Sequence, residues 1–181
     1  RLLESVLDAS LEAQVLKSDN SALARDCEKE CRELRRVLLK LDPRKDRTAR
    51  NDARRELRRL AKEEKARQRK AVDEVIGGSN VICASLSGAL SNSLRDQSFD
   101  VVVIDEAAQA LEAACWGAIL KGRKVVLAGD HLQLPPTVMS DEAAKKGLSE
   151  TLFARVHAKW HGIGVARMLT TQYRMNRHIM Q

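Results

Sequence analysis

VVVIDEAAQ, the stretch from Val101 to Gln109, decides the fold of this chain. Its first four residues, Val101 to Ile104, are all β-branched and too few for an ordinary helix, so they predict a strand buried on both faces. Asp105 and Glu106 follow at the carboxyl end of that strand. Because carboxylates are costly to remove from water, a buried strand ending in Asp-Glu usually opens onto a crevice where a cation or polar ligand meets them. A strand that simply ends in a polar turn is the competing interpretation.

Two further apolar runs extend the β pattern. Asn80 to Ala84 predicts a strand that leads into a loop of small residues, and Lys124 to Ala128 predicts another that ends in Gly129-Asp130. A helix is expected from about Gln109 to Leu120. Apolar strands separated by connecting segments predict an open parallel sheet with helices on both faces. Ligands of such sheets bind beyond the carboxyl ends of the strands, where four side chains should gather: Ser85, Asp105, Glu106 and Asp130.

The residues before this sheet predict two long helices. Residues 1–17 carry apolar side chains at helical spacing, and residues 18–21 (SDNS) supply a break and an N-cap. The next apolar positions, from Ala24 to Leu41, alternate steps of three and four as in a coiled-coil seam, until Asp42-Pro43 ends the pattern. A second helical pattern runs from about Thr48 to Ile76. Together they predict an antiparallel hairpin over residues 21–76 that projects from the domain.

Positive charge is concentrated in the second of these helices. The chain of 181 residues has a net charge of +7, whereas Arg44 to Lys70 alone holds thirteen Lys and Arg against five Asp and Glu, a net charge of +8. Such a segment is most often a solvated helix face, and following a nucleic-acid backbone is the less favoured interpretation. Aromatic residues make up only 3% of the chain, which disfavours a base-stacking platform for nucleic acid.

Cysteine usage and hydropathy limit the class of protein. The four cysteines, Cys27, Cys31, Cys83 and Cys115, lie in apolar patterns without CxxC pairs, which predicts reduced core thiols. No apolar run approaches the length of a membrane span, and nothing at Arg1 resembles a signal peptide. The sequence therefore predicts a soluble cytoplasmic or nuclear protein with no membrane partner.

Two polar motifs follow the last predicted strand. His131 to Pro136 (HLQLPP) is stiffened by two prolines, and the amide of Gln133 can donate to a phosphate oxygen and accept from water. Further on, residues 172–175 (QYRM) include Arg174, whose planar fork of donors suits a phosphate. A lone arginine is usually a surface charge, but DEAAQ, GDHLQLPP and QYRM in this order form a highly specific set.

This set resembles the motifs of the superfamily 1 helicases of the RNA-surveillance and immunoglobulin-mu-binding-protein type. The resemblance is strong from Asn80 to Met175 and looser in the hairpin, which resembles the helical stalk of these enzymes. It implies a partial RecA-like (P-loop NTPase) parallel sheet and ATP-driven 5′-to-3′ translocation on single-stranded DNA or RNA, with ATP and Mg²⁺ as cofactors. It also implies four parts: a helical lead-in (1–20), the basic stalk (21–76), the RecA-like core (77–166) and the start of a second RecA-like domain (167–181).

The resemblance also implies roles for individual residues. Asp105 would bind Mg²⁺, and Glu106 would polarise the attacking water. Gln133 would sense the γ-phosphate, Asp130 would brace the Gln133 loop, and Arg174 would stabilise charge in the transition state, which agrees with phosphoryl transfer being mostly positioning and charge neutralisation. The predicted nucleotide site is therefore Asp105, Glu106, Asp130, Gln133, Gln172 and Arg174, and the predicted nucleic-acid contacts are Ser85, Ser87 and Gly88.

The chain departs from this family in one respect. It contains no GxxxxGK[ST] motif, so the loop whose amides and lysine cradle the phosphates is missing. Because the chain also stops at Gln181, we expect an internal fragment of a larger helicase that does not hydrolyse ATP alone. Its partners would be single-stranded DNA or RNA and the remaining parts of the same helicase chain, namely the Walker A segment and the second RecA-like domain.

Two rival functions stay open at this level. A coiled-coil chromosome-organising ATPase of the ABC type would also have a helical arm, an LSG sequence, Asp-Glu and a histidine in this order. Ala89 in place of the second signature glycine weighs against that rival, which also gives no reason for QLPP or QYRM. A non-enzymatic basic coiled-coil binder explains the hairpin but leaves the acidic strand ends unexplained.

Overall fold

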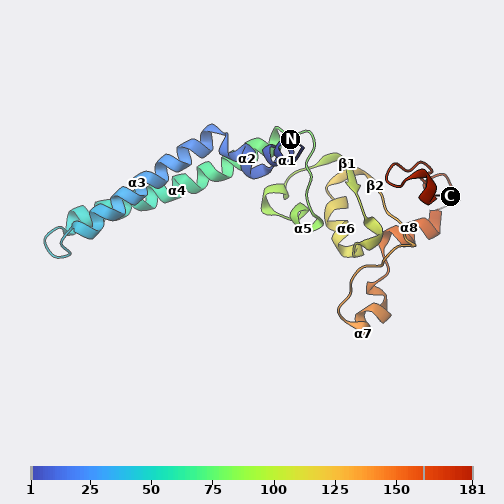
Figure 1. Ribbon diagram of the computed structural model, residues 1–181. Coiled ribbons are helices and arrows are strands. Elements are labelled where there is room, and N and C mark those ends of the chain that lie inside the picture. The colour runs from blue at the N-terminus through green and yellow to red at the C-terminus, as the bar shows by residue number, and fades with distance from the viewer. Residues whose placement is uncertain (1, 161, 181) are drawn as a thin grey trace. The chain divides into compact units, whose positions relative to one another are not determined.

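The computed structural model describes residues 2–160 and 162–180 of the chain (Figure 1). The chain divides into two compact units, residues 1–83 and residues 84–181. The first unit is helical, and the second contains a short parallel sheet. The chain is therefore a mixed α/β protein, as the sequence predicts.

In its described residues, the first unit consists of α1 (Leu2–Asp8), α2 (Leu11–Leu16), α3 (Asp19–Lys40) and α4 (Arg47–Gly77). Two serines start helices, because the Ser10 hydroxyl accepts the N–H of Ala13 and the Ser18 hydroxyl accepts the N–H of Ser21. The break at Ser18 confirms the prediction. The single helix predicted before it is instead two helices, since Ser10 caps a new one.

Helices α3 and α4 lie side by side and run antiparallel, as predicted (Figure 1). At one end of the pair, the side-chain amide of Asn20 donates to both carboxylate oxygens of Glu74 at 2.9 Å. At the other end, the guanidinium of Arg50 donates to the carbonyls of Leu38 and Leu41 at 3.3 and 2.7 Å. These bonds fix the register of the two helices at both ends.

The seam between α3 and α4 is apolar. Cys27, Cys31 and Leu60 are buried there, with Leu34 and Leu57 packed against them. The alternating spacing of three and four residues in α3 thus gives the buried stripe that it predicts. Burial raises the pKa of the Cys27 thiol, which keeps it protonated and unreactive.

The second unit is built around strands β1 (Phe99–Ile104) and β2 (Gly122–Leu127), which pair in parallel with Val102 opposite Val125 and Ile104 opposite Leu127. Helix α6 (Glu112–Ile119) connects them. The helix predicted from Gln109 begins later, because the chain first makes the short turn η2 (Ala107–Gln109). The remaining elements are α5 (Leu86–Ala89), η1 (Asn92–Leu94), α7 (Asp141–Ala143), η3 (Ala144–Leu148), α8 (Leu152–Trp160) and α9 (Arg177–Met180).

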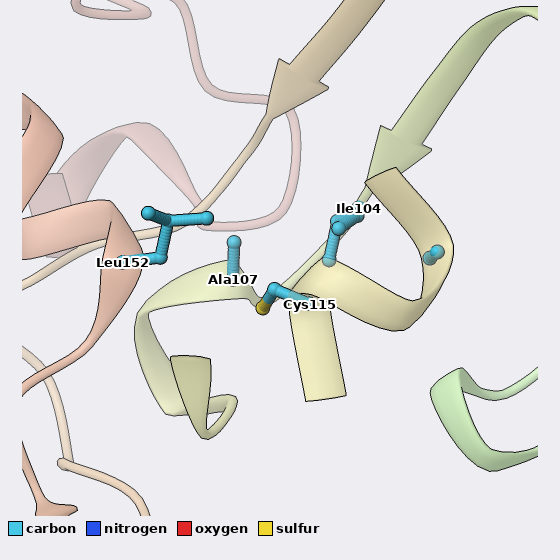
Figure 2. Close-up of a cluster of buried hydrophobic side chains, with 5 residues drawn as sticks. Ile104, Ala107, Cys115 and Leu152 are labelled. Carbon is cyan, nitrogen blue, oxygen red and sulfur yellow. The ribbon is translucent and has the colours of Figure 1, made fainter. Parts of the chain in front are cut away.

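One face of the sheet carries the hydrophobic core of this unit. Ile104 of β1, Ala107 of η2, Cys115 of α6 and Leu152 of α8 meet in a single buried cluster that also includes Ala118 (Figure 2). Elements that are distant in the sequence therefore meet beneath the carboxyl end of β1. Burial raises the pKa of the Cys115 thiol, so this cysteine is a packing residue.

The other face of the sheet is exposed, so the prediction of a strand buried on both faces is wrong. Successive side chains of a strand point to opposite faces, and the Val101 and Val103 side chains lie on the face away from the core. Val103 is 65% exposed, and Val126 beside it on β2 is also exposed. No described element of the chain covers this face, so helices cover the sheet on one side only.

The strand predicted from Asn80 to Ala84 is also wrong. These residues are not part of the sheet, because β1 and β2 pair only with each other among the described residues. Without a ladder partner most of the segment is at the surface: Val81 is 80% exposed, although Ile82 is half-buried. Cys83 is exposed as well, unlike the other three cysteines, which are buried as predicted.

Candidate nucleotide site

The carboxyl ends of β1 and β2 are joined by backbone hydrogen bonds. The N–H of Ala128 donates to the carbonyl of Ile104 at 2.9 Å, and the N–H of Ala107 donates to the carbonyl of Ala128 at 2.8 Å. The segment Asp105-Glu106, here called the acidic turn, lies between these two bonds and is exposed. The structure thus places the carboxylates that follow β1 beside the loop that follows β2, as the parallel sheet predicts.

The acidic turn has an unusual backbone. Glu106 has φ 52° and ψ 35°, the left-handed backbone conformation that residues other than glycine rarely adopt. Such a residue costs about 1–3 kcal/mol, and residues of this kind cluster at functional sites. The Asp105 carboxylate accepts the N–H of Glu106 at 3.0 Å, and the side-chain amide of Gln109 donates to the Glu106 carboxylate at 3.0 Å. These two bonds hold the turn and orient the Glu106 side chain.

Gly129 lets the second strand approach the acidic turn closely. A Cβ at this position would lie 2.9 Å from the backbone nitrogen of Ala108 and 3.2 Å from that of Ala107. The contact is with backbone, which cannot move aside as the end of a flexible side chain can. Neither Gly129 nor the Gln109 amide is among the predicted site residues. DEAAQ contains Gln109, but its bond to Glu106 is visible only in the structure.

Asp130 organises the loop after β2. Its carboxylate accepts the N–H of Leu132 at 2.9 Å and the side-chain amide of Gln133 at 3.2 Å, and these bonds hold the pKa of Asp130 below its ordinary value. The predicted neighbours Asp130 and Gln133 are therefore in direct contact. In this arrangement the amide nitrogen of Gln133 is engaged with Asp130. Both side chains are exposed on the edge of the sheet that carries the acidic turn.

We predict that Gln133→Ala raises the pKa of Asp130 toward the ordinary value for aspartate without reaching it, because the N–H of Leu132 stays in place. A lowered pKa in the folded state means that this carboxylate adds stability above its unfolded pKa and loses that contribution as the pH falls through the folded-state pKa. Carboxyl ¹³C chemical shifts of labelled aspartates measure the change. Gln109→Ala, which removes an amide from Glu106 instead, should leave the Asp130 titration where it is. An unaltered pKa in Gln133→Ala contradicts this assignment.

The QYRM segment is a self-contained turn. The side-chain carbonyl of Gln172 accepts the N–H of Met175 at 2.7 Å, and its amide nitrogen donates to the carbonyl of Met175 at 3.0 Å. Arg174 is exposed. Within the described part of the chain, no hydrogen bond or ion pair joins Arg174 to the acidic turn. Backbone hydrogen bonds thus hold the Asp105-Glu106 turn beside the residues that lead into Asp130 and Gln133. Within the described residues, no hydrogen bond or ion pair joins Gln172 or Arg174 to any of these four side chains.

The small-residue loop forms the start of α5. Ser85 is the N-cap of this helix, and its hydroxyl accepts the N–H of Gly88 at 3.1 Å. Ser85 and Ser87 are both exposed. Their predicted contact with a nucleic-acid backbone stays a prediction.

Helix α8 supports the acidic turn from beneath. Leu152 at its start is buried against Ala107, which directly follows the turn. The guanidinium of Arg155 donates from two nitrogens to the carboxylate of Glu112, which ties α8 to α6. Glu112 also accepts the indole N–H of Trp116, and these bonds hold the pKa of Glu112 below its usual range.

The donor set of the turn suits a divalent cation shared with phosphates. Mg²⁺ usually keeps several waters and binds to one or two protein carboxylates plus substrate phosphate oxygens. Asp105 supplies such a carboxylate on an exposed edge. No group of three or more His, Cys, Asp or Glu in residues 2–160 and 162–180 is arranged to enclose a metal ion by itself.

None of the helices in these residues is long and apolar enough to cross a membrane.

Comparison with known proteins agrees with this geometry. A family model described as an AAA domain matches residues 1–141. The chain is 45% identical to the "DNA-binding protein SMUBP-2" of Mus musculus over 99% of its length, and 37% identical to the "DNA polymerase alpha-associated DNA helicase A" of Schizosaccharomyces pombe over 97%. It is 40% identical to the "ATP-dependent helicase NAM7" of Saccharomyces cerevisiae over 62%. It spans 18%, 25% and 11% of these three relatives, respectively.

A parallel strand pair with carboxylates beyond its carboxyl ends, together with the AAA-domain match, defines the class as a P-loop nucleoside triphosphatase domain. The chain belongs to the AAA-domain family matched here and, within that class, to the superfamily 1 helicases of the RNA-surveillance and immunoglobulin-mu-binding-protein type. This membership excludes the rival ABC-type family.

Proposed function

We propose that this chain is the part of an ATP-dependent nucleic-acid helicase that carries the hydrolysis carboxylates and the loop that responds to the γ-phosphate. The observation that carries the proposal is the pair of backbone hydrogen bonds that Ala128 forms with Ile104 and Ala107, on either side of the acidic turn. These bonds hold the turn that carries Asp105 and Glu106 beside the residues that lead into Asp130, at the carboxyl ends of a parallel strand pair. Ligands of parallel sheets bind beyond such ends, which supports the proposal. Similarity to relatives named as helicases supports the same function.

The residues act on the terminal phosphate by position and charge. ATP, when bound, would supply the phosphoryl group and its negative charge, and Mg²⁺ would neutralise part of that charge. Asp105 would hold the metal ion through its carboxylate, and Glu106, oriented by Gln109, would align a water and take its proton. Gln133 would contact the γ-phosphate, with Asp130 fixing its loop. Arg174 would neutralise developing charge once its segment reaches the site.

The architecture proposed for the complete protein is that of a RecA-like ATPase. The second unit would be part of the first RecA-like core, and α3 and α4 would be its stalk. The predicted boundaries are 1–20, 21–76, 77–166 and 167–181. The first and last ends, residues 1 and 181, lie outside the described residues. Ser85, Ser87 and Gly88 would contact single-stranded DNA or RNA. The proposed location of such a protein is the cytoplasm or the nucleus.

This chain would not hydrolyse ATP by itself. Its sequence has no GxxxxGK[ST] loop to cradle the phosphates, so the rest of the same helicase would supply that loop and a second RecA-like domain. The test compares phosphate release by the complete protein and by residues 1–181 alone, each with and without single-stranded nucleic acid. We expect release only from the complete protein, stimulated by nucleic acid. If nucleic acid does not stimulate phosphate release by the complete protein, the helicase proposal is refuted. If the isolated chain releases phosphate, the claim that it needs a phosphate-binding loop from the rest of the helicase is refuted.

A further inference from the structure

A one-sided row of cations runs along α4. Its members, Arg54, Arg58, Lys62, Lys65 and Arg69, follow one another at steps of four, four, three and four residues. At 3.6 residues per turn, this spacing places them within an arc of about 80° and along about 22 Å of the helix. All five side chains are exposed. They are called the α4 cation row below.

Other cations of α4 are neutralised by carboxylates of the same helix. Arg59 pairs with Glu56 at 2.6 Å and with Glu63 at 3.1 Å, and Arg67 pairs with Glu63 at 3.4 Å. The hydrogen bond from Arg59 to Glu56, together with the nearby negative charges, raises the pKa of the Arg59 guanidinium. These pairs lie on a different side of α4 from the cation row, because their residues fall at other positions of the helical repeat.

The α4 cation row has no such partners. Among the residues that the structure describes, none of its five members forms an ion pair. Its first four members have no Asp or Glu three or four residues away, the spacing at which pairs form within a helix. Arg69 has Asp73 at that spacing, yet no ion pair joins them in the described chain. Successive members repel each other, so the row costs helix stability when nothing else binds to it.

We propose that the α4 cation row binds the phosphate backbone of a single-stranded nucleic acid. The proposal rests on the function proposed above, which provides such a polyanion. A charge that repeats about once per helical turn over about 22 Å suits a continuous chain of phosphates better than an isolated anion. Phosphate contacts position a nucleic acid without reading its bases, and none of the row's members is aromatic, so this binding is independent of sequence.

The test compares two variants of the complete protein that lose the same charge. The row variant changes Arg54, Arg58, Lys62, Lys65 and Arg69 to Gln. The control variant changes five paired cations of α3 and α4 to Gln, namely Lys29, Arg32, Arg59, Arg67 and Lys70. Glutamine keeps the helix propensity close to that of Arg and Lys. Fluorescence anisotropy with labelled oligothymidine and oligouridine gives the observed binding constant over a range of salt concentrations, and circular dichroism checks that both variants fold.

The logarithm of the binding constant falls with the logarithm of salt concentration, and we expect the magnitude of this negative slope to decrease by at least about 1.4 in the row variant, the equivalent of two phosphate contacts on a single strand. The control variant should change it by less than half as much. A smaller fall in the row variant, or the same fall in both variants, overturns the inference. If the inference is overturned but the unaltered complete protein hydrolyses ATP and binds both oligonucleotides, the proposed function still stands. If the unaltered protein neither hydrolyses ATP nor binds the oligonucleotides, the proposed function and the inference both fail.

Discussion

Glu106→Gln in the complete protein is expected to lower the turnover number for ATP hydrolysis by at least about 100-fold, because a positioned general base contributes about 10²- to 10⁴-fold. Glutamine has the same shape and can still contact Gln109, but it cannot take a proton from water. The left-handed backbone at Glu106 should be unaffected, since the change is confined to the end of the side chain. Steady-state phosphate release at saturating ATP and single-stranded nucleic acid measures the effect.

The matched control for this prediction is Glu142→Gln, which removes one exposed carboxylate of the same unit far along the chain from the acidic turn. In the part of the chain that the structure describes, Glu142 forms an ion pair with Lys146 alone, and both side chains are more than two-thirds exposed, so its loss should leave turnover nearly unchanged. Binding of ATP should also survive in Glu106→Gln, because Asp105 still provides the carboxylate for the metal ion. Equal turnover in Glu106→Gln and the unaltered protein would remove Glu106 from the chemistry.

Gly129→Ala adds a single methyl group, and we expect this group to displace the acidic turn. The added methyl group would be 2.9 Å from the backbone nitrogen of Ala108, so either the turn or the end of β2 must move. Overpacking of this kind costs about 1–3 kcal/mol. The N–H of Ala107, which bonds to the carbonyl of Ala128 at 2.8 Å, should lose hydrogen-exchange protection. Because small displacements of catalytic groups are costly, turnover should fall by about 100-fold.

Gly77→Ala is the control for this substitution. Gly77 ends α4, and among the described residues no atom beyond the neighbouring residues and the backbone of the same helix lies within 4 Å of the position of an added Cβ. Alanine should therefore fit and slightly favour the helix. Hydrogen-exchange mass spectrometry of both variants in the complete protein follows the peptides that contain Ala107 and the end of α4. Unchanged protection at Ala107 in Gly129→Ala would show that the close approach is not needed to hold the turn.

The parts of the fold that follow from local pattern could be predicted from the sequence. Four consecutive β-branched residues gave β1, and the apolar run after Lys124 gave β2. The alternating spacing from Ala24 gave the buried stripe of α3. The meeting of Asp105 and Glu106 with the Asp130 loop followed from a topological rule, that parallel strands end at the same edge of a sheet.

The features that depend on a neighbour could not be predicted in this way. Asn80 to Ala84 has the composition of a strand but no partner strand to pair with in the described chain. The left-handed conformation of Glu106 has no signal in the sequence, because glutamate gives no preference for positive φ. The importance of Gly129 depends on its distance from Ala108, and the pairing of Arg59 rather than Arg58 depends on which face of α4 carries the carboxylates.

In the proposed function, Asp105, Glu106, Gln133 and Arg174 surround one terminal phosphate. The most direct measurement is a crystal structure of the complete protein with Mg²⁺, a non-hydrolysable ATP analogue and a single-stranded oligonucleotide. We predict that Asp105 lies in the coordination shell of the metal ion, and that Gln133 and Arg174 lie within hydrogen-bonding distance, about 2.7–3.2 Å, of γ-phosphate oxygens. A γ-phosphate bound away from the acidic turn, with Gln133 and Arg174 both remote from it, would contradict the claim.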